Sequence, residues 1–396
     1  MDSKKEVVIV AGVRTAIGDF GGALKDHSPT ELAAKCVAEV ISRGSINADE
    51  VGHVVFGNVI HTEPKDMYLS RVAAINGGIP KEVPAFTLNR LCGSGLQALV
   101  SAAQIIQLGD ATITVAGGAE SMSRSNYWLP AARWGAKMGD QKIMDSMLGA
   151  LADPFEGMHM GITAENVAEQ FEIDRETQDA FAVESHRRAT EAIRGGLFKE
   201  QILPIEIKDR KGLKVFDTDE HVRSDVSLEN LAKLRPAFKK DGTVTAGNAS
   251  GINDGAAALL LMERSEAEKR GLKPLGQLVS YGHAGVDPRV MGLGPIPSTT
   301  NALQIAGITA GDLDVIESNE AFAAQACAVS KGLKLDPEKV NPNGGAVALG
   351  HPVGATGAII AIKALYELNR VGGTYALATM CIGGGQGISA IFKRIS

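Results

Sequence analysis

Residues 89–118 read NRLCGSGLQALVSAAQIIQLGDATITVAGG and decide the fold. A cysteine, Cys92, stands among glycines directly before an apolar helical pattern over residues 96–108. A glycine, a strand-like run at 111–116 and a glycine pair follow. The stretch predicts a helix followed by a buried strand, which is the repeating unit of an α/β protein.

The same order of parts returns near the end of the chain. Residues 351–385 read HPVGATGAIIAIKALYELNRVGGTYALATMCIGGG, with a helical pattern at 358–368 and a strand-like run at 375–380. This similarity predicts two duplicated α/β halves, in which Cys92 and His351 lie at equivalent helix N-termini and face one another across a pseudo-twofold axis. A chance match between two α/β units is the alternative.

Other segments extend the alternation of strands and helices. Strand-like runs lie at 7–13, 54–60 and 315–318, and a helical pattern covers 30–42. The alternation favours an α/β protein with mostly parallel sheets. From about residue 122 to about residue 250 charge density rises, so we interpret this segment as an inserted loop domain.

Composition excludes several classes of protein. The 396 residues are 44% hydrophobic and 22% charged, which predicts two or three domains, and the net charge of -6 argues against nucleic-acid binding. We expect no membrane span, because charge or glycine interrupts each apolar stretch before about 18 residues. The four cysteines form no C-x-x-C pair. This predicts free thiols in a reducing, cytoplasmic compartment and no metal site.

Two thiols and an imidazole are the candidates for chemistry. At a helix N-terminus the thiolate of Cys92 should be favoured, although a small buried apolar role is the alternative, as we expect for Cys36 and Cys327. His351 precedes a helix in a setting that suits a proton-transfer group. Cys381 ends a strand beside a triple glycine whose amides could hold an oxyanion.

Two further residues are weaker candidates. His159 lies between methionines and glycines, and Asn319 lies at a strand-to-helix junction, where a helix N-cap is its alternative role. The glycine-rich segments do not have the G-x-G-x-x-G spacing after a first strand, which argues against a dinucleotide-binding oxidoreductase.

Six motifs in order resemble those of thiolases, across the entire chain. They are NRLCGSG at 89–95, GGAESMS at 117–123, GNASGINDG at 247–255, NEAFA at 319–323, GHP at 350–352 and CIGGG at 381–385. Within the family the chain is most similar to bacterial acetyl-CoA acetyltransferases and β-ketothiolases.

The resemblance implies a thiolase fold of two pseudo-duplicated α/β/α halves with an inserted loop domain. The N-terminal half would comprise residues 1–121 and 252–274, the loop domain 122–251, and the C-terminal half 275–396. It also implies a cytoplasmic homotetramer built as a dimer of dimers, in fatty acid metabolism or polyhydroxyalkanoate biosynthesis.

The resemblance further implies a reversible, ping-pong condensation of two acyl-CoA molecules. Cys92 would carry the acyl group as a thioester, His351 would accept its proton, and Cys381 would be the acid and base at the α-carbon. His351 and a water held by Asn319 would form one oxyanion hole, and the backbone amides of Cys92 and Gly383 the other.

Coenzyme A enters as substrate and product, with no tightly bound cofactor expected. The resemblance maps Arg223 to its nucleotide end, where a solvent-facing role is equally open, and Ser250 to its pantetheine arm. It maps Leu151, His159 and Met291 near the tunnel for that arm.

Three other interpretations compete. A ketoacyl synthase shares the expected fold and nucleophile, but it usually lacks a second cysteine before the triple glycine, so Cys381 speaks against it. A non-catalytic acyl carrier should have lost a catalytic residue, and a metal site at Cys92, His351 and Cys381 would be incompatible with two free thiols.

Overall fold

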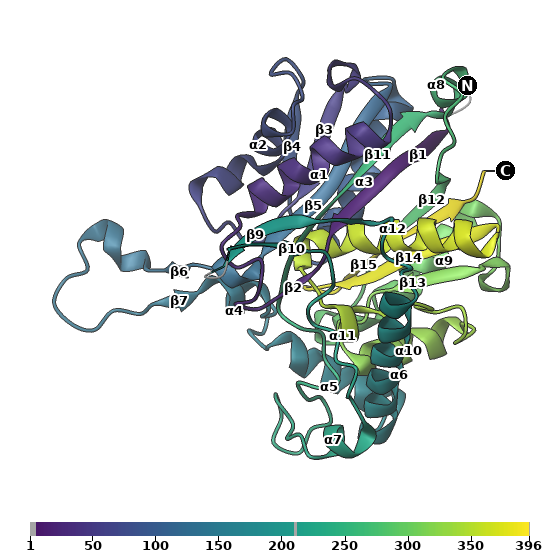
Figure 1. The fold of residues 1–396 in the computed structure, drawn as a ribbon. Coiled ribbons are helices and arrows are strands. Elements are labelled where there is room, and N and C mark those ends of the chain that lie inside the picture. Colours follow the sequence, from purple (N-terminus) through teal and green to yellow (C-terminus); the bar gives the residue numbers. More distant parts are fainter. Residues whose placement is uncertain (1–4, 210–211, 396) are drawn as a thin grey trace.

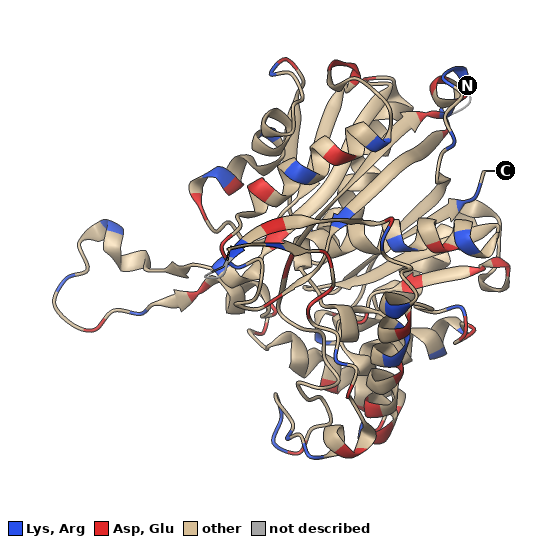
Figure 2. Ribbon diagram, in the orientation of Figure 1, with Lys and Arg blue, Asp and Glu red and all other residues tan. Residues whose placement is uncertain are grey.

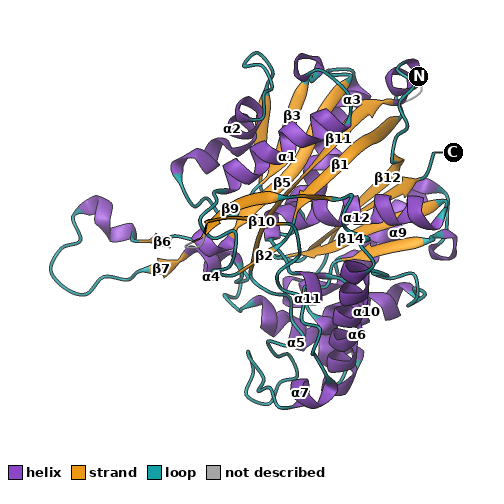
Figure 3. Ribbon diagram, viewed as in Figure 1, coloured by secondary structure: helices purple, strands orange, loops and turns teal. Residues whose placement is uncertain are grey.

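The computed structural model describes residues 5–209 and 212–395, whose elements alternate between strand and helix along much of the chain (Figures 1 and 3). The strands are β1 (Val7–Thr15), β2 (Gly18–Asp19), β3 (His53–Gly57), β4 (Ala85–Leu88), β5 (Ile113–Ser121), β6 (Tyr127–Trp128), β7 (Met144–Asp145), β8 (Ile202–Leu203), β9 (Ile205–Asp209), β10 (Gly212–Phe216), β11 (Asn253–Glu263), β12 (Gly276–Gly285), β13 (Val315–Ser318), β14 (Tyr375–Ile382) and β15 (Gln386–Lys393). The α-helices are α1 (Pro29–Arg43), α2 (Leu69–Asn76), α3 (Ser94–Leu108), α4 (Ser146–Ala150), α5 (Met160–Phe171), α6 (Arg175–Arg194), α7 (Leu228–Ala232), α8 (Arg264–Lys269), α9 (Pro295–Ala306), α10 (Ala323–Leu333), α11 (Ala346–Leu349) and α12 (Val353–Val371).

One large sheet carries the duplication that the sequence predicts. Its path runs β13-β14-β15-β12-β1-β11-β5-β3-β4, and the halves join where β1 pairs antiparallel with β12. In the first half β1, β11 and β5 pair antiparallel in turn and β5 pairs parallel with β3. In the second half β12, β15, β14 and β13 repeat these directions. The two halves therefore share one topology.

The expectation of mostly parallel sheets is wrong. Among the strands of the described residues, parallel pairing is limited to the pairs made by β3, β13 and the short β8, and the central strands are antiparallel. The reason lies in the connections. Between β14 and β15 the chain reverses in a tight turn through Gly384 and Gly385, whose φ angles of 83° and 85° suit glycine.

Two buried helices cross at the centre of the fold. α3 and α12 contact each other, and α12 also contacts β5 and β11 of one half and β13 and β14 of the other. A Cβ added at Gly95 of α3 would lie 2.6 Å from the amide nitrogen of Ala358, and one at Gly357 would meet the amide of Leu96. Glycine at both positions lets the backbones touch, which brings the N-terminal ends of the helices together.

The stretch Leu91–Leu108, which includes α3, corrects the expectation that no apolar stretch reaches the length of a membrane span. Its mean hydropathy is 1.3 over 18 residues, enough to cross a membrane by length and composition alone. In this fold α3 packs against α12, β3 and β5, so most of its apolar side chains belong to the protein core.

Most of the chain between β5 and β11 forms helices and hairpins that lie outside the large sheet. Figure 2 shows red and blue gathered on α6 and α7, whereas the strands of the large sheet are mostly tan. The hairpin of β6 and β7 extends away from the rest of the molecule (Figure 1). It carries exposed apolar side chains, among them Tyr127, Trp134 and Ile143.

Candidate active site

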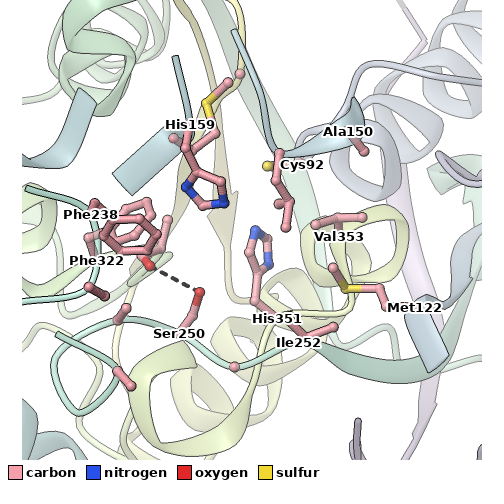
Figure 4. Close-up of a pocket in the computed structure, with 18 of the residues that line it drawn as sticks. Cys92, Met122, Ala150, His159, Phe238, Ser250, Ile252, Phe322, His351 and Val353 are labelled. Atoms are coloured by element: carbon pink, nitrogen blue, oxygen red, sulfur yellow. Dashed lines mark hydrogen bonds between the residues drawn. The ribbon is translucent and has the colours of Figure 1, made fainter. Parts of the chain in front are cut away.

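A cavity of about 420 Å³ opens beside the N-terminal ends of α3 and α12. Eight of the residues singled out in the sequence line it: Cys92, Leu151, His159, Arg223, Ser250, Met291, His351 and Gly383. Figure 4 shows the side chains of Cys92 and His351 beside each other in this cavity. Segments far apart in the chain therefore converge on one site.

A tight turn presents Cys92. Leu91, directly before it, has a left-handed φ of 47°, and its amide donates to Asn89 Oδ1 at 2.9 Å. Ser94 Oγ accepts from the amide of Arg90 at 2.8 Å and donates to the carbonyl of Leu91 at 2.7 Å. A non-glycine residue in this backbone region is strained, so the polar side chains on both sides hold the thiol in position.

The predicted preference for the Cys92 thiolate is wrong for the resting enzyme. Burial raises the pKa of the Cys92 thiol to about 11, although the backbone amides of Gly383 and of Cys92 itself lower it. Desolvation outweighs these amides because a thiolate loses the hydration that it would have in water. The thiol is therefore neutral at rest and needs a base.

His351 supplies an imidazole that is neutral at physiological pH. Burial lowers its pKa to about 4, and its residue is only 6% exposed. Its amide donates to Asn253 Oδ1 at 2.8 Å and its Nδ1 lies 2.7 Å from Thr356 Oγ1. Within the described part of the chain, its buried Nε2 has no hydrogen-bond partner. One ring nitrogen is therefore available to a reacting group.

Cys381 lies behind the cavity rather than on its surface. It is fully buried near the end of β14, in an apolar cluster with Met160, Met291 and Phe322, which do line the cavity. Burial raises the pKa of its thiol well above the usual range, and repulsion by Cys92 adds to this shift. Because the two sulfurs interact, ionisation of one opposes ionisation of the other.

Asn319 faces a second, smaller cavity of about 20 Å³, which Thr356 also lines. The alternative of a helix N-cap is wrong, because α10 begins at Ala323 with Phe322 as its cap. Both polar atoms of the Asn319 side chain are buried and, among the residues described, have no partner. A cavity of this size has room for a water molecule, which would satisfy them.

The mouth of the large cavity combines one cation with an apolar wall. Arg223 is exposed, and no carboxylate of the described residues forms an ion pair with its guanidinium. His159 caps α5, accepting from the amide of Gly161 at 3.0 Å, and its ring stacks on Phe238 at 4.6 Å. Burial lowers the pKa of His159, which favours the neutral ring.

Several residues at or near the site were not predicted from the sequence. Phe238 and Met160 line the cavity, but single apolar residues such as these carry no pattern in the sequence. Glu120, inside the quoted motif at 117–123, is a fully buried carboxyl that accepts from the amides of Val59, Ile60 and Gly354. These bonds end β3 at Gly57, earlier than the predicted strand at 54–60, and burial raises the pKa of Glu120 to about 8.

Comparison with protein families gives one consistent result. Residues 7–265 match the family profile described as "Thiolase, N-terminal domain", and residues 272–394 match that described as "Thiolase, C-terminal domain". Together the two profiles span nearly all of the chain.

Individual relatives agree with the family profiles. The chain is 66% identical to the beta-ketothiolase BktB of Cupriavidus necator over 392 residues, which are 99% of this chain and 100% of that protein. It superposes on the crystal structure of the Bacillus anthracis acetyl-CoA acetyltransferase with a TM-score of 0.97 and 47% identity, over 100% of both chains. It superposes on human mitochondrial 3-ketoacyl-CoA thiolase in complex with CoA with a TM-score of 0.96 and 43% identity, over 99% of this chain and 98% of that one.

Proposed function

The chain belongs to the thiolase family, and from that premise we propose how its own residues carry out the reaction. The protein is an acyltransferase that joins two acyl-CoA molecules into a 3-ketoacyl-CoA and free CoA, and catalyses the reverse thiolysis. The observation that carries our assignment of roles is the meeting of Cys92, His351 and the Gly383 backbone in one cavity, with the Cys381 thiol directly behind it.

Acylation begins with two neutral groups. Nε2 of His351 takes the proton of Cys92, and the thiolate attacks the carbonyl carbon of the acyl-CoA. The tetrahedral oxyanion accepts hydrogen bonds from the amides of Cys92 and Gly383, which lie against the Cys92 sulfur. Collapse expels the CoA thiolate, which takes the proton from His351, and leaves an acyl thioester on Cys92.

Condensation uses the second thiol. Cys381, as its thiolate, removes a proton from the α-carbon of the second acyl-CoA, and the enolate carbon attacks the thioester carbonyl on Cys92. Collapse of the tetrahedral intermediate breaks the C–S bond and releases the 3-ketoacyl-CoA. The expelled Cys92 thiolate takes the proton that Cys381 acquired, so both thiols return to their starting states. The enolate oxygen is held by His351 and by a water on Asn319, whose unpartnered side chain supports that role. Acylation converts Cys92 to a neutral thioester that cannot ionise, so no Cys92 thiolate opposes the ionisation of Cys381 in the second step.

Coenzyme A thioesters are the ligands of the cavity. The exposed Arg223 suits the anionic nucleotide, and the wall formed by Leu151, Met291 and the stacked His159 and Phe238 suits the pantetheine arm. Ser250 Oγ donates to the carbonyl of Ala321 at 3.0 Å and keeps its lone pairs available to an amide of the arm. Short acyl chains are the substrates we propose.

Thiolysis with a graded set of substrates tests this proposal. Acetoacetyl-CoA, 3-ketovaleryl-CoA and the six-carbon homologue would be offered with free CoA to the wild-type protein and to Cys92→Ala as the blank. We expect turnover of the shorter substrates by the wild type alone. A folded wild-type protein that cleaves none of them would overturn the proposed roles and substrates together.

We also propose that the protein is a homotetramer and that the β6–β7 hairpin contributes to its assembly. Trp134 at 80% and Ile143 at 62% exposure are large apolar side chains at the surface of a projecting segment, where burial against another copy would remove them from water. Trp134→Glu should reduce the mass measured by light scattering, whereas Leu108→Glu, at an exposed apolar residue on α3, should not. A tetramer unaffected by Trp134→Glu and Ile143→Glu together would contradict the role of the hairpin.

For location we propose the cytoplasm, in metabolism that forms or cleaves short 3-ketoacyl-CoA compounds. All four cysteines are free thiols, which suits a reducing compartment. Fractionation of source cells, with immunodetection of the protein, tests this; recovery outside the cytoplasmic fraction would contradict it.

A further inference from the structure

The His351 ring makes one side-chain hydrogen bond within the described residues, between Nδ1 and Thr356 Oγ1 at 2.7 Å. Thr356 lies in the first turn of α12, five residues after His351, and is 2% exposed. Its hydroxyl is also 2.9 Å from the carbonyl oxygen of Pro352. Both residues of this contact are buried, so we expect the hydroxyl to determine how the ring is held.

The single hydrogen of the Thr356 hydroxyl limits the directions of its two hydrogen bonds. The hydroxyl has one hydrogen, and the geometry directs it to the Pro352 carbonyl, which can only accept. With the hydroxyl hydrogen directed to that carbonyl, the oxygen of Thr356 accepts from Nδ1, so in this arrangement the neutral ring carries its proton on Nδ1 and its lone pair on Nε2. We propose that Thr356 is a positioning residue that presents Nε2 of His351 to Cys92 as a base; this inference rests on the proposed function.

A hydroxyl is better suited to this position than a carboxylate. A carboxylate beside Nδ1 would favour the charged ring and raise the pKa of His351, whereas burial next to a neutral hydroxyl leaves the ring neutral and ready to accept a proton. A carboxylate would also fix the Nδ1–H tautomer, because it only accepts hydrogen bonds.

The hydroxyl can also serve the opposite tautomer. The Pro352 carbonyl already accepts from the amides of Ala355 at 2.8 Å and Thr356 at 2.9 Å, so it does not depend on the hydroxyl. When the neutral ring carries its proton on Nε2, the hydroxyl can turn and donate to Nδ1. The same residue thus supports His351 both as a proton acceptor for Cys92 and as a donor to an enolate oxygen.

Substitutions that remove only the hydroxyl test this inference. Thr356→Val should lower kcat for thiolysis by about 10- to 100-fold, part of the 10²–10⁴-fold that a positioned base supplies, with KM changed less than about two-fold. Thr356→Ser should restore kcat to within about three-fold of wild type. Thr299→Val is the matched control, because it removes a buried hydroxyl that bonds Thr379 and Ser389 instead, and its kcat should stay at the wild-type value.

Two outcomes would overturn the role of Thr356: a Thr356→Val enzyme with wild-type kcat, or a folded Thr356→Ser enzyme as slow as Thr356→Val. Alkylation of Cys92 by iodoacetamide separates this inference from the proposed function, since it needs no acyl-CoA. If the wild type shows no turnover, the proposed function falls, yet slower alkylation in Thr356→Val by about ten-fold would still support the base-positioning role, and equal rates would reject it.

Neutron diffraction from wild-type crystals at neutral pD gives a test that does not depend on a variant folding. Deuterium on Nδ1, directed at Thr356 Oγ1, with none on Nε2, is the expected result. Deuterium on Nε2 with a bare Nδ1 in the unliganded protein would overturn the assignment of the resting tautomer.

Discussion

The two halves of the molecule share a topology and differ in what connects their strands. In the first half, residues 122–252 separate β5 from β11 and contribute most of the cavity wall. In the second, only Gly383–Gly385 separates β14 from β15, and this turn contributes the Gly383 amide. Equivalent helices begin just after Cys92 in one half and His351 in the other. The duplicated topology places Cys92 and His351 at equivalent helix N-termini. The two connections differ in length: the long one forms most of the cavity wall, and the short one contributes the Gly383 amide that donates to the oxyanion.

The largest expected effect comes from breaking the first half alone. Cys92→Ser should lower thiolysis by about 10⁴-fold or more, because a serine hydroxyl is a much weaker acid and a base with a pKa near 4 cannot ionise it. Steady-state thiolysis of acetoacetyl-CoA measures this. Cys327→Ala is the control, at a cysteine on α10 that does not line the large cavity. Residual activity near the wild-type rate in Cys92→Ser would remove Cys92 as the nucleophile.

Breaking the second half should separate the two chemical steps. Cys381→Ser should still form acyl-enzyme from acetyl-CoA, but condensation should fall by about 10³-fold, because the group that takes the α-proton is lost. Intact-protein mass measurement follows acylation, and acetoacetyl-CoA formation follows condensation. Equal losses of both steps in a folded variant would mean that the thiols do not have separate tasks.

The contact between the halves is the next point to break. A Cβ at Gly357 would meet the backbone of α3, so Gly357→Ala should lower the free energy of unfolding by about 1–3 kcal/mol. The same substitution should shift His351 away from Cys92 and thereby lower kcat by up to about 10²-fold. Urea unfolding and thiolysis measure the two effects. Gly311→Ala is the control, since its Cβ would meet only Thr309 Oγ1, at an ordinary contact distance of 3.6 Å. An unchanged Gly357→Ala enzyme would show that the helices tolerate separation.

The smallest expected effects are in pH dependence, which should reflect the raised pKa of Cys92 in the first half and the lowered pKa of His351 in the second. With a pKa of about 11, Cys92 carries roughly one thiolate in ten thousand at pH 7, so its alkylation in the absence of substrate should keep rising between pH 7 and 10. The lowered pKa of His351 means that its base form is present above about pH 4 and is lost as pH falls through that value. The acid limb of thiolysis should therefore lie below pH 5. An alkylation plateau at pH 7 would indicate a resting thiolate–imidazolium pair instead.

The positions of many strands and helices could be predicted from the sequence, whereas the pKa values of the site residues could not. Hydrophobic periodicity located β1, β13 and α3 closely, and the motif order led to the residues that line the large cavity. The direction of the strand beside β14 depended on a three-residue glycine turn rather than on periodicity. The pKa of Cys92 depended on burial by residues distant in the chain, which outweighed the local helix terminus. Likewise, the hydrogen bond between His351 and Thr356 could not be predicted from the sequence, because it depends on the distance between the two side chains in the folded protein.

Mapping the acyl group tests the division between the halves most directly. Wild-type protein would be mixed with acetyl-CoA, quenched in acid, digested and analysed by peptide mass spectrometry. We expect one acetyl group per chain on the peptide that contains Cys92, and none on the peptide that contains Cys381. An acetyl group on Cys381, or turnover of acetyl-CoA with no acetyl group on Cys92, would contradict it.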